Sequence, residues 1–283
     1  MRANEAIRKI SALLKGAGVS ASEKEAELIV CFILKTDKTA LYRDNPEITE
    51  DSYQDIIARR LMREPLQYIT SEVEFLDLTL KVGPGVLIPR PETELVTTEA
   101  VRLIKDNFAE PLTILDLCTG SGSIAISLAK AFPNSLVYGV DISEKALSYA
   151  RENALINSIS NVVFLHGNLF EPVGNIKFNV VVSNPPYIKT GDISELDPEI
   201  CCYEPVEALD GGADGLRFYR KIFEQAKNYM RPEKFLIVLE IGYDEASDIQ
   251  KIATDAGHKN IQFKKDYAGL DRMVFVQNVF SLM

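Results

Sequence analysis

The sequence predicts an α/β protein in which a small helical domain precedes a mostly parallel seven-stranded sheet. Three observations lead to this prediction. The first 65 residues show helical periodicity, and from about residue 92 short apolar runs alternate with helical segments. The last two apolar runs have no helix between them, which predicts an antiparallel pair. Repeating strand–helix units imply a parallel sheet that is covered on both faces.

Capping signals divide the front of the chain into helices. Ser22 followed by Glu25 matches a capping box and predicts a helix start before an apolar run. Thr49 is expected to cap a third helix, which ends before Pro65. We therefore predict a helical domain over residues 1–70.

A short strand-rich connector is predicted over residues 71–91. Leucine and valine alternate with polar residues from Leu76 to Val82, which is the period of a half-buried strand. The segment Gly83–Gly85, with proline at its centre, then ends the strand.

The third segment, residues 92–283, carries the predicted sheet. Its expected strands are 113–117, 136–140, 162–165, 178–182, 235–241, 261–265 and Met273–Val279. Its expected helices lie at 96–108, 122–131, 143–157, 216–230 and 244–256.

Composition excludes several classes of protein. Hydrophobic residues make up 46% of the 283 residues, enough to build a core, so disorder is excluded as the main state. The chain has no apolar run of about 18 residues and no secretory signal pattern, so we expect neither a membrane span nor export. The 4 cysteines and 2 histidines match no zinc pattern, so no metal site and a cytoplasmic location with reduced thiols are predicted.

The charge balance argues against a nucleic-acid surface. The net charge is −10, whereas long phosphate-tracking surfaces need clustered lysine and arginine. We therefore expect no direct nucleic-acid partner. Arg59, Arg60 and Arg63 form a small basic cluster that is either a solvated helix face or a contact with a partner.

A glycine-rich loop follows the first strand of the predicted sheet. It runs from Asp116 to Gly122, and Asp141 ends the next strand, 21 residues after Gly120. Glycines allow a close backbone approach to a ligand, and such an acid can accept hydrogen bonds from ribose hydroxyls. The loop also fits a dinucleotide fingerprint, or a tight turn without ligand. Asp116 disfavours a pyrophosphate and suits a ligand with an ammonium group, such as S-adenosylmethionine.

The segment Asn184–Tyr187 directly follows the fourth strand, at the sheet edge where open α/β proteins bind ligands. The Asn184 side-chain oxygen and the Pro185 carbonyl can each accept a hydrogen bond from a planar NH2 group, and Tyr187 offers a ring for stacking. Polarising and orienting such a group would favour its attack on a methyl donor. The plainer interpretation is a proline-rich turn. Glu240, at the end of a later strand, is either structural or a support for this site.

At these residues the sequence resembles the class I S-adenosylmethionine-dependent methyltransferases, which have a Rossmann-like fold and an Asn-Pro-Pro-Tyr motif. Further segments resemble the peptide chain release factor glutamine methyltransferase family over nearly the whole chain. These segments are 63–69, Ile88–Glu94, Glu204–Leu216, Leu239–Gly242 and 266–272.

This resemblance implies methyl transfer from S-adenosylmethionine to the side-chain amide of the glutamine in the Gly-Gly-Gln motif of release factors. It assigns cofactor binding to Cys118, Thr119, Gly120, Ser121, Gly122, Asp141, Leu169 and Asn184. It assigns substrate binding to Asn184, Pro185, Pro186 and Tyr187, with catalysis at Asn184, Pro185 and Tyr187. The stretch Asn168–Phe170 is expected to flank the adenine. Cys118 stands where the generic loop has glycine, and a residue with a Cβ adopts positive φ only at a cost.

Two alternatives use the same chemistry. One is methylation of a glutamine in a ribosomal protein. The other is methylation of adenine in DNA or RNA, which requires base flipping and a basic channel that the sequence does not show.

Overall fold

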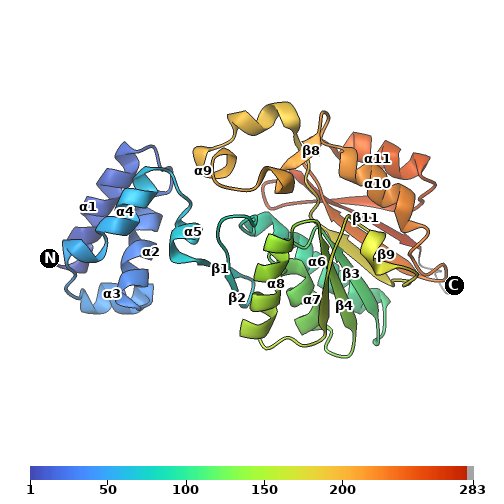
Figure 1. Ribbon diagram of the computed structural model, residues 1–283, viewed down its shortest axis with the longest axis horizontal. Coiled ribbons are helices and arrows are strands. Elements are labelled where there is room, and N and C mark those ends of the chain that lie inside the picture. Colours follow the sequence, from blue (N-terminus) through green and yellow to red (C-terminus); the bar gives the residue numbers. More distant parts are fainter. Residues whose placement is uncertain (279–283) are drawn as a thin grey trace. The chain divides into compact units, whose positions relative to one another are not determined.

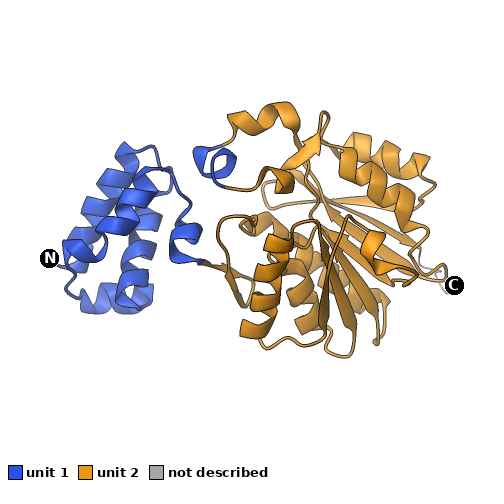
Figure 2. Cartoon of the chain, viewed as in Figure 1, with its two compact units in different colours: residues 1–71, 197–203 blue, residues 72–196, 204–283 orange. Residues whose placement is uncertain are grey.

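The computed structural model describes residues 1–278. The chain forms two compact units (Figure 2). Unit 1 contains residues 1–71 together with 197–203, and unit 2 contains residues 72–196 and 204–278 of the described chain. Within the described residues, no helix combines the length and the apolar character needed to cross a membrane.

Unit 1 is helical. Its elements are α1 (Ala3–Gly16), α2 (Ser22–Leu34), α3 (Lys38–Asp44), a 3₁₀ turn (Glu50–Ser52), α4 (Gln54–Leu61), α5 (Leu66–Thr70) and α9 (Pro198–Cys201). The helix α1 buries Ile7, Ile10 and Leu14 at helical spacing, and these side chains pack with apolar residues of α2 and α4 in one core.

Both capping predictions in unit 1 are wrong in detail. Ser22 is the first residue of α2 and its side chain makes no cap hydrogen bond. Glu25 points elsewhere, because its carboxylate accepts hydrogen bonds from the Arg60 guanidinium. Thr49 precedes a 3₁₀ turn, and α4 begins five residues later at Gln54. Tertiary ion pairing therefore outweighs the local cap in α2.

The segment 197–203 belongs to unit 1 although it lies far from the rest of this unit in sequence. Glu199 of α9 accepts hydrogen bonds from Arg60 Nη2 at 2.7 Å and from Arg63 Nε and Nη2 at 2.7 and 2.5 Å. The Tyr203 hydroxyl donates to the Met62 carbonyl at 2.6 Å. Of the basic cluster, Arg60 is thus a buried internal partner.

Unit 2 opens with a hairpin. The strands β1 (Glu72–Phe75) and β2 (Leu78–Lys81) pair antiparallel, with Leu76 at positive φ in the turn. The predicted alternation holds in β2, where Leu78 and Leu80 are buried. Leu76 lies in the two-residue turn between β1 and β2 instead of in the strand.

The main sheet of unit 2 has seven strands in the order β10-β11-β9-β6-β3-β4-β5. Figure 1 labels β11, β9, β3 and β4 of this sheet. The bounds of the seven strands are β3 Thr113–Leu117, β4 Leu136–Asp141, β5 Val162–His166, β6 Val180–Ser183, β9 Phe235–Glu240, β10 Ile261–Lys265 and β11 Asp271–Asn278. Among them, β11 pairs antiparallel with both β9 and β10, while β3, β4, β5, β6 and β9 pair parallel. The predicted fold class is confirmed.

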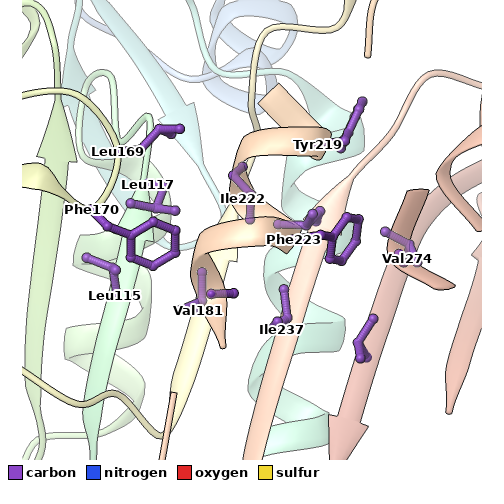
Figure 3. Close-up of a cluster of buried hydrophobic side chains, with 14 of the residues drawn as sticks. Leu115, Leu117, Leu169, Phe170, Val181, Tyr219, Ile222, Phe223, Ile237 and Val274 are labelled. Atoms are coloured by element: carbon purple, nitrogen blue, oxygen red, sulfur yellow. The ribbon is translucent and has the colours of Figure 1, made fainter. Parts of the chain in front are cut away.

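Two apolar clusters cover the faces of this sheet. On one face, α10 (Arg217–Ala226) and α11 (Ala246–Asp255) pack on Leu115, Val181 and Ile237; Figure 3 shows part of this cluster. On the other face, α6 (Pro91–Asn107) and α7 (Ser123–Ala131) pack on alternate residues of the same strands, such as Ile114 and Val180. The helix α8 (Glu144–Ile156) contacts β4, β5 and the β2 strand of the hairpin.

Small elements complete unit 2. The strands β7 (Ile188–Lys189) and β8 (Asp210–Gly212) pair parallel, and 3₁₀ turns occupy Glu171–Val173, Thr190–Glu195 and Val206–Ala208. The fourth predicted strand begins two residues late, at Val180, because Phe178 forms an isolated bridge with Met230. Val279, predicted to end the last strand, lies outside the described residues.

Candidate active site

A cavity of about 810 Å³ lies at the carboxyl ends of the central strands of unit 2. The strand β3 lies between β4 and β6. After β3 the chain adds β4 and β5 on one side of it and then returns to add β6 on the other side. Open α/β sheets bind ligands at such a reversal of strand order. Residues that line the cavity are 85–87, 89, 93, 118–121, 123–124, 140–143, 145–146, 167–169, 184, 186, 205–208, 210 and 217–218. The glycine loop and the Asn184 segment therefore share one cavity.

The glycine loop turns through the left-handed region of backbone space. Cys118, Gly120 and Gly122 have φ of 57°, 55° and 83°. A Cβ at Gly120 would meet nothing within 4 Å, so the glycine leaves the backbone open to the cavity. Gly122 does not line the cavity; it caps α7, and a Cβ there would lie 3.0 Å from Ile126. Cys118 lines the cavity, and burial raises the pKa of its thiol well above the ordinary value.

Asp116 corrects one sequence-based expectation. Its side chain is fully buried and does not line the cavity. Its Oδ2 accepts hydrogen bonds from Thr119 Oγ1 at 2.5 Å and from the Ala125 amide at 3.1 Å. Burial raises the pKa of Asp116 to about 7. Asp116 therefore fixes the loop from behind and does not face a ligand's ammonium group.

Asp141 lies at the cavity wall, at the end of β4. Its Oδ2 accepts from the Gly120 amide at 2.8 Å and its Oδ1 from the Ser143 amide at 2.9 Å. Burial raises the pKa of Asp141, although these amide hydrogen bonds oppose the shift. The remaining lone pairs are available to hydroxyl groups of a ligand.

The loop is also held by Asn153, a residue that no sequence motif singles out. Asn153 of α8 is fully buried, and its amide nitrogen donates to the Ser121 carbonyl at 2.9 Å and to the Lys81 carbonyl at 3.1 Å. Its Oδ1 accepts from the Lys81 amide at 2.6 Å. A polar residue on the apolar face of a predicted helix was the only available signal.

The stretch after β5 divides between the cavity and the core. Asn168 and Leu169 line the cavity, and the Asn168 amide donates to Glu171 Oε1 at 3.1 Å. Leu169 is buried with φ of 49°. Phe170 instead stacks on Tyr229, with ring centroids 4.7 Å apart, inside the core cluster of Figure 3.

The segment Asn184–Tyr187 begins directly after β6. Asn184 and Pro186 line the cavity, whereas Pro185 and Tyr187 do not. Asn184 Nδ2 donates to Thr93 Oγ1 at 3.1 Å, and Thr93 Oγ1 donates to Glu240 Oε2 at 2.7 Å. The Tyr187 hydroxyl donates to Glu240 Oε1 at 3.4 Å.

Glycines allow close packing behind Tyr187. A Cβ at Gly211 would lie 2.5 Å from the Gly215 carbonyl oxygen and 2.8 Å from the Tyr187 Cα. A Cβ at Gly215 would lie 2.5 Å from the Tyr187 carbonyl oxygen. Only glycine fits at these positions, so the β7–β8 pairing supports the segment after Asn184 from outside the cavity.

Glu240 is a buried acidic residue next to the Asn184 segment. It ends an apolar strand and its side chain is almost completely buried. Burial raises the pKa of Glu240 to about 7; Thr93, Arg272 and Tyr187 act against the shift and Glu92 adds to it. In the sequence, the signal for a support of the site was a charged residue at the end of the apolar run Phe235–Leu239.

Two further walls of the cavity include residues of the segments Ile88–Glu94 and Glu204–Leu216, which resemble the methyltransferase family. Residues 85–87 and 89 form one wall, and residues 205–208 form another. Arg90 Nη2 donates to Glu204 Oε2 at 2.6 Å, next to both walls. Among residues 1–278, no group of three or more His, Cys, Asp or Glu side chains is placed to hold a metal ion.

Comparisons with known proteins agree over most of the chain. A methyltransferase domain model matches residues 109–274, and a PrmC N-terminal domain model matches residues 5–70. The release factor glutamine methyltransferase of Thermodesulfovibrio yellowstonii is 48% identical over 262 residues, which are 92% of this chain and 94% of that protein. The release factor glutamine methyltransferase of Geobacter sulfurreducens is 40% identical and covers 95% of each chain. A solved methyltransferase from Pyrococcus furiosus shares the fold, with a TM-score of 0.54, 20% identity and coverage of 79% of this chain and 98% of its own.

Proposed function

Because the chain belongs to the release factor glutamine methyltransferase family, we propose that it methylates the side-chain amide nitrogen of glutamine in the Gly-Gly-Gln motif of release factors, using S-adenosylmethionine. One observation carries this proposal. The Asn184 carboxamide, the glycine loop at Gly120 and the Asp141 carboxylate line the same cavity of about 810 Å³. A cavity of this size accommodates a cofactor with a short stretch of substrate.

The residues present fit S-adenosylmethionine. The Gly120 backbone is open to the cavity, and the Asp141 carboxylate can accept from ribose hydroxyls. Leu169 supplies an apolar surface for the adenine, and Asn168 lies beside it. The bound cofactor would supply an electrophilic methyl group on a positively charged sulfur.

The chain's own contribution is to orient the amide of the substrate. A planar amide nitrogen is a weak nucleophile because its lone pair is delocalised. Asn184 Oδ1 would accept one N–H of this group and so fix the direction of the nitrogen. Pro185 is buried and does not line the cavity, so the predicted second acceptor, its carbonyl, is not open to the substrate amide. The fixed dipole of the Asn184 carboxamide also favours positive charge on the nitrogen as the N–CH3 bond forms. The bond between the methyl group and the sulfur would break as the N–CH3 bond forms, which would leave a neutral thioether. The nitrogen would then lose one proton to water, and no strong base is needed before that step.

Tyr187 would remain a neutral phenol in this mechanism. Burial raises its pKa well above the ordinary value, with the Glu240 carboxylate adding to the shift. Its hydroxyl is directed at Glu240 and the residue does not line the cavity, so its contribution would be to hold the segment after Asn184 in place.

We assign recognition of the release factor to unit 1, since this unit has its own core and contributes no residue to the cavity. The chain's net charge of −10 favours a protein partner over a nucleic acid.

The test is methyl transfer from labelled S-adenosylmethionine to a purified release factor. We expect label on the wild-type factor and none on its Gly-Gly-Gln→Gly-Gly-Ala variant or on duplex DNA. A purified ribosomal-protein mixture is the second comparison. Label on that mixture or on DNA, without label on the release factor, would refute the proposed substrate.

Two variants separate the roles within the site. Asn184→Ala should lose turnover but retain cofactor binding, because only the orientation of the amide is lost. Asp141→Ala should weaken cofactor binding by roughly 1.5–3 kcal/mol, the range for hydrogen bonds to a charged group. Titration calorimetry measures both affinities, and wild-type affinity in Asp141→Ala would contradict the assignment.

A further inference from the structure

We propose that Thr93 and Glu240 are positioning residues that decide which end of the Asn184 carboxamide faces the cavity. The inference rests on the proposed function, because it concerns the group that would receive the substrate amide. The three residues come from distant parts of the chain. Thr93 lies in the first turn of α6, Asn184 follows β6, and Glu240 is the last residue of β9.

The contacts form one short chain of hydrogen bonds. Thr93 Oγ1 lies 2.7 Å from Glu240 Oε2 and 3.1 Å from Asn184 Nδ2. Thr93 is 3% exposed and Glu240 is 1% exposed, so water does not compete freely for either group.

The direction of this chain follows from the donors available. A carboxylate can only accept, so the single hydroxyl hydrogen of Thr93 is directed to Glu240. The Thr93 oxygen can then only accept from Asn184, which must turn its NH2 group toward Thr93. The Asn184 oxygen is left for the cavity, where it can accept from an N–H of a substrate amide.

The opposite orientation would be unproductive. With its NH2 group in the cavity, Asn184 would present donors to the donors of a substrate amide. A carboxamide alone has little preference between the two orientations, since its oxygen and nitrogen ends are nearly equal in size. The preference therefore has to come from its neighbours.

Glu240 also holds the other end of the same segment. Its second oxygen accepts from the Tyr187 hydroxyl at 3.4 Å, so one carboxylate contacts the segment 184–187 directly at Tyr187 and through Thr93 at Asn184. Its ionised form has no hydrogen to donate, which gives the orientation of Thr93 its single direction.

The experiment compares Thr93→Val, Thr93→Ser and Glu240→Gln in the full chain. Valine keeps the shape of threonine without the hydroxyl, and serine keeps the hydroxyl. A glutamine at position 240 can donate a hydrogen bond to Thr93 Oγ1. Thr93 is then free to donate to the Asn184 oxygen, which would reverse the Asn184 carboxamide. We expect Thr93→Val and Glu240→Gln to lower kcat for a release factor roughly 10- to 100-fold, while Thr93→Ser stays within about threefold of wild type.

Further readouts distinguish positioning from a general loss of structure. The Kd for S-adenosylhomocysteine and the melting temperature of Thr93→Val should match those of Thr93→Ser. The kcat of the double variant Thr93→Val with Glu240→Gln should be no lower than that of the less active single variant, because both changes break the same chain of hydrogen bonds. Equal losses in Thr93→Val and Thr93→Ser, or multiplied losses in the double variant, would overturn the inference.

A measurement without substrate keeps the inference testable if the proposed function fails. In protein labelled with ¹⁵N only at asparagine, the Asn184 NH2 signals are those missing from Asn184→Ala. These hydrogens should exchange slowly in wild type and in Thr93→Ser, and at least tenfold faster in Thr93→Val. If wild type methylates no release factor but this pattern appears, the proposed substrate is wrong and the orientation of Asn184 stands. Fast exchange of these hydrogens in wild type would refute the orientation itself.

Discussion

Replacing Glu199 with glutamine should release the segment 197–203 from the rest of unit 1. Glu199 receives three hydrogen bonds from two guanidinium groups, at 2.5–2.7 Å. Burial opposes its charge, but the bonds from Arg63 and Arg60 outweigh this and hold the pKa of Glu199 below its ordinary value. The Glu199→Gln variant keeps the size of the side chain and removes the charge, so it isolates the ion pairs.

The expected magnitude follows from what remains. Breaking a buried ion pair costs roughly 3–5 kcal/mol when one charge is left unpaired. Arg60 keeps its two bonds to Glu25, and the Glu199 side chain is 17% exposed, so the cost should lie below that range. We expect about 2 kcal/mol, which corresponds to a roughly 30-fold increase in the population of the opened segment.

Hydrogen exchange measures this opening locally. The amides of Ile200 and Cys201 donate to the carbonyl of Asp197, which precedes α9, and the amide of Cys202 donates to the carbonyl of Pro198, so they are protected only while this helix is formed. They should exchange about 30-fold faster in Glu199→Gln at equal pH. Glu50→Gln is the matched control, because the Lys9–Glu50 pair lies on the surface, with side chains 49% and 44% exposed. Exchange in Glu199→Gln within twofold of wild type would refute the reasoning.

Three other predictions concern unit 2. Turnover of wild type should rise with pH through about 7. The reason is that the Glu240 carboxyl, whose pKa is raised to about 7, orients its neighbours only when it is ionised. A pH–rate profile with the same step in Glu240→Gln would contradict this. Gly211→Ala should lose most activity and stability, because its Cβ would overlap the Gly215 carbonyl and Tyr187. A urea denaturation midpoint equal to that of wild type would show that the packing there is looser. Cys118→Gly should be more stable than Cys118→Ala by about 1 kcal/mol, because alanine keeps a Cβ at φ of 57°; equal denaturation midpoints would show no strain there.

The sequence by itself determined the fold class and the two motifs. Period-two and helical spacing report which side chains must be buried, and burial sets the layers of a domain. The strand order places the Gly120 loop and Asn184 on one cavity, because parallel strands bring their carboxyl ends to one edge. Asp141 and Leu169 line the same cavity, because Asp141 ends β4 and Leu169 lies shortly after β5.

Only the tertiary structure decided the partners of the buried polar groups. Glu25 matched a local cap but pairs with Arg60, and Asp116 matched a ligand-facing acid but holds its own loop. Thr93 and Glu240 meet across 147 positions of sequence. A buried charge must find compensation wherever the fold brings a donor, and the local pattern carries no information about a donor so distant in the chain.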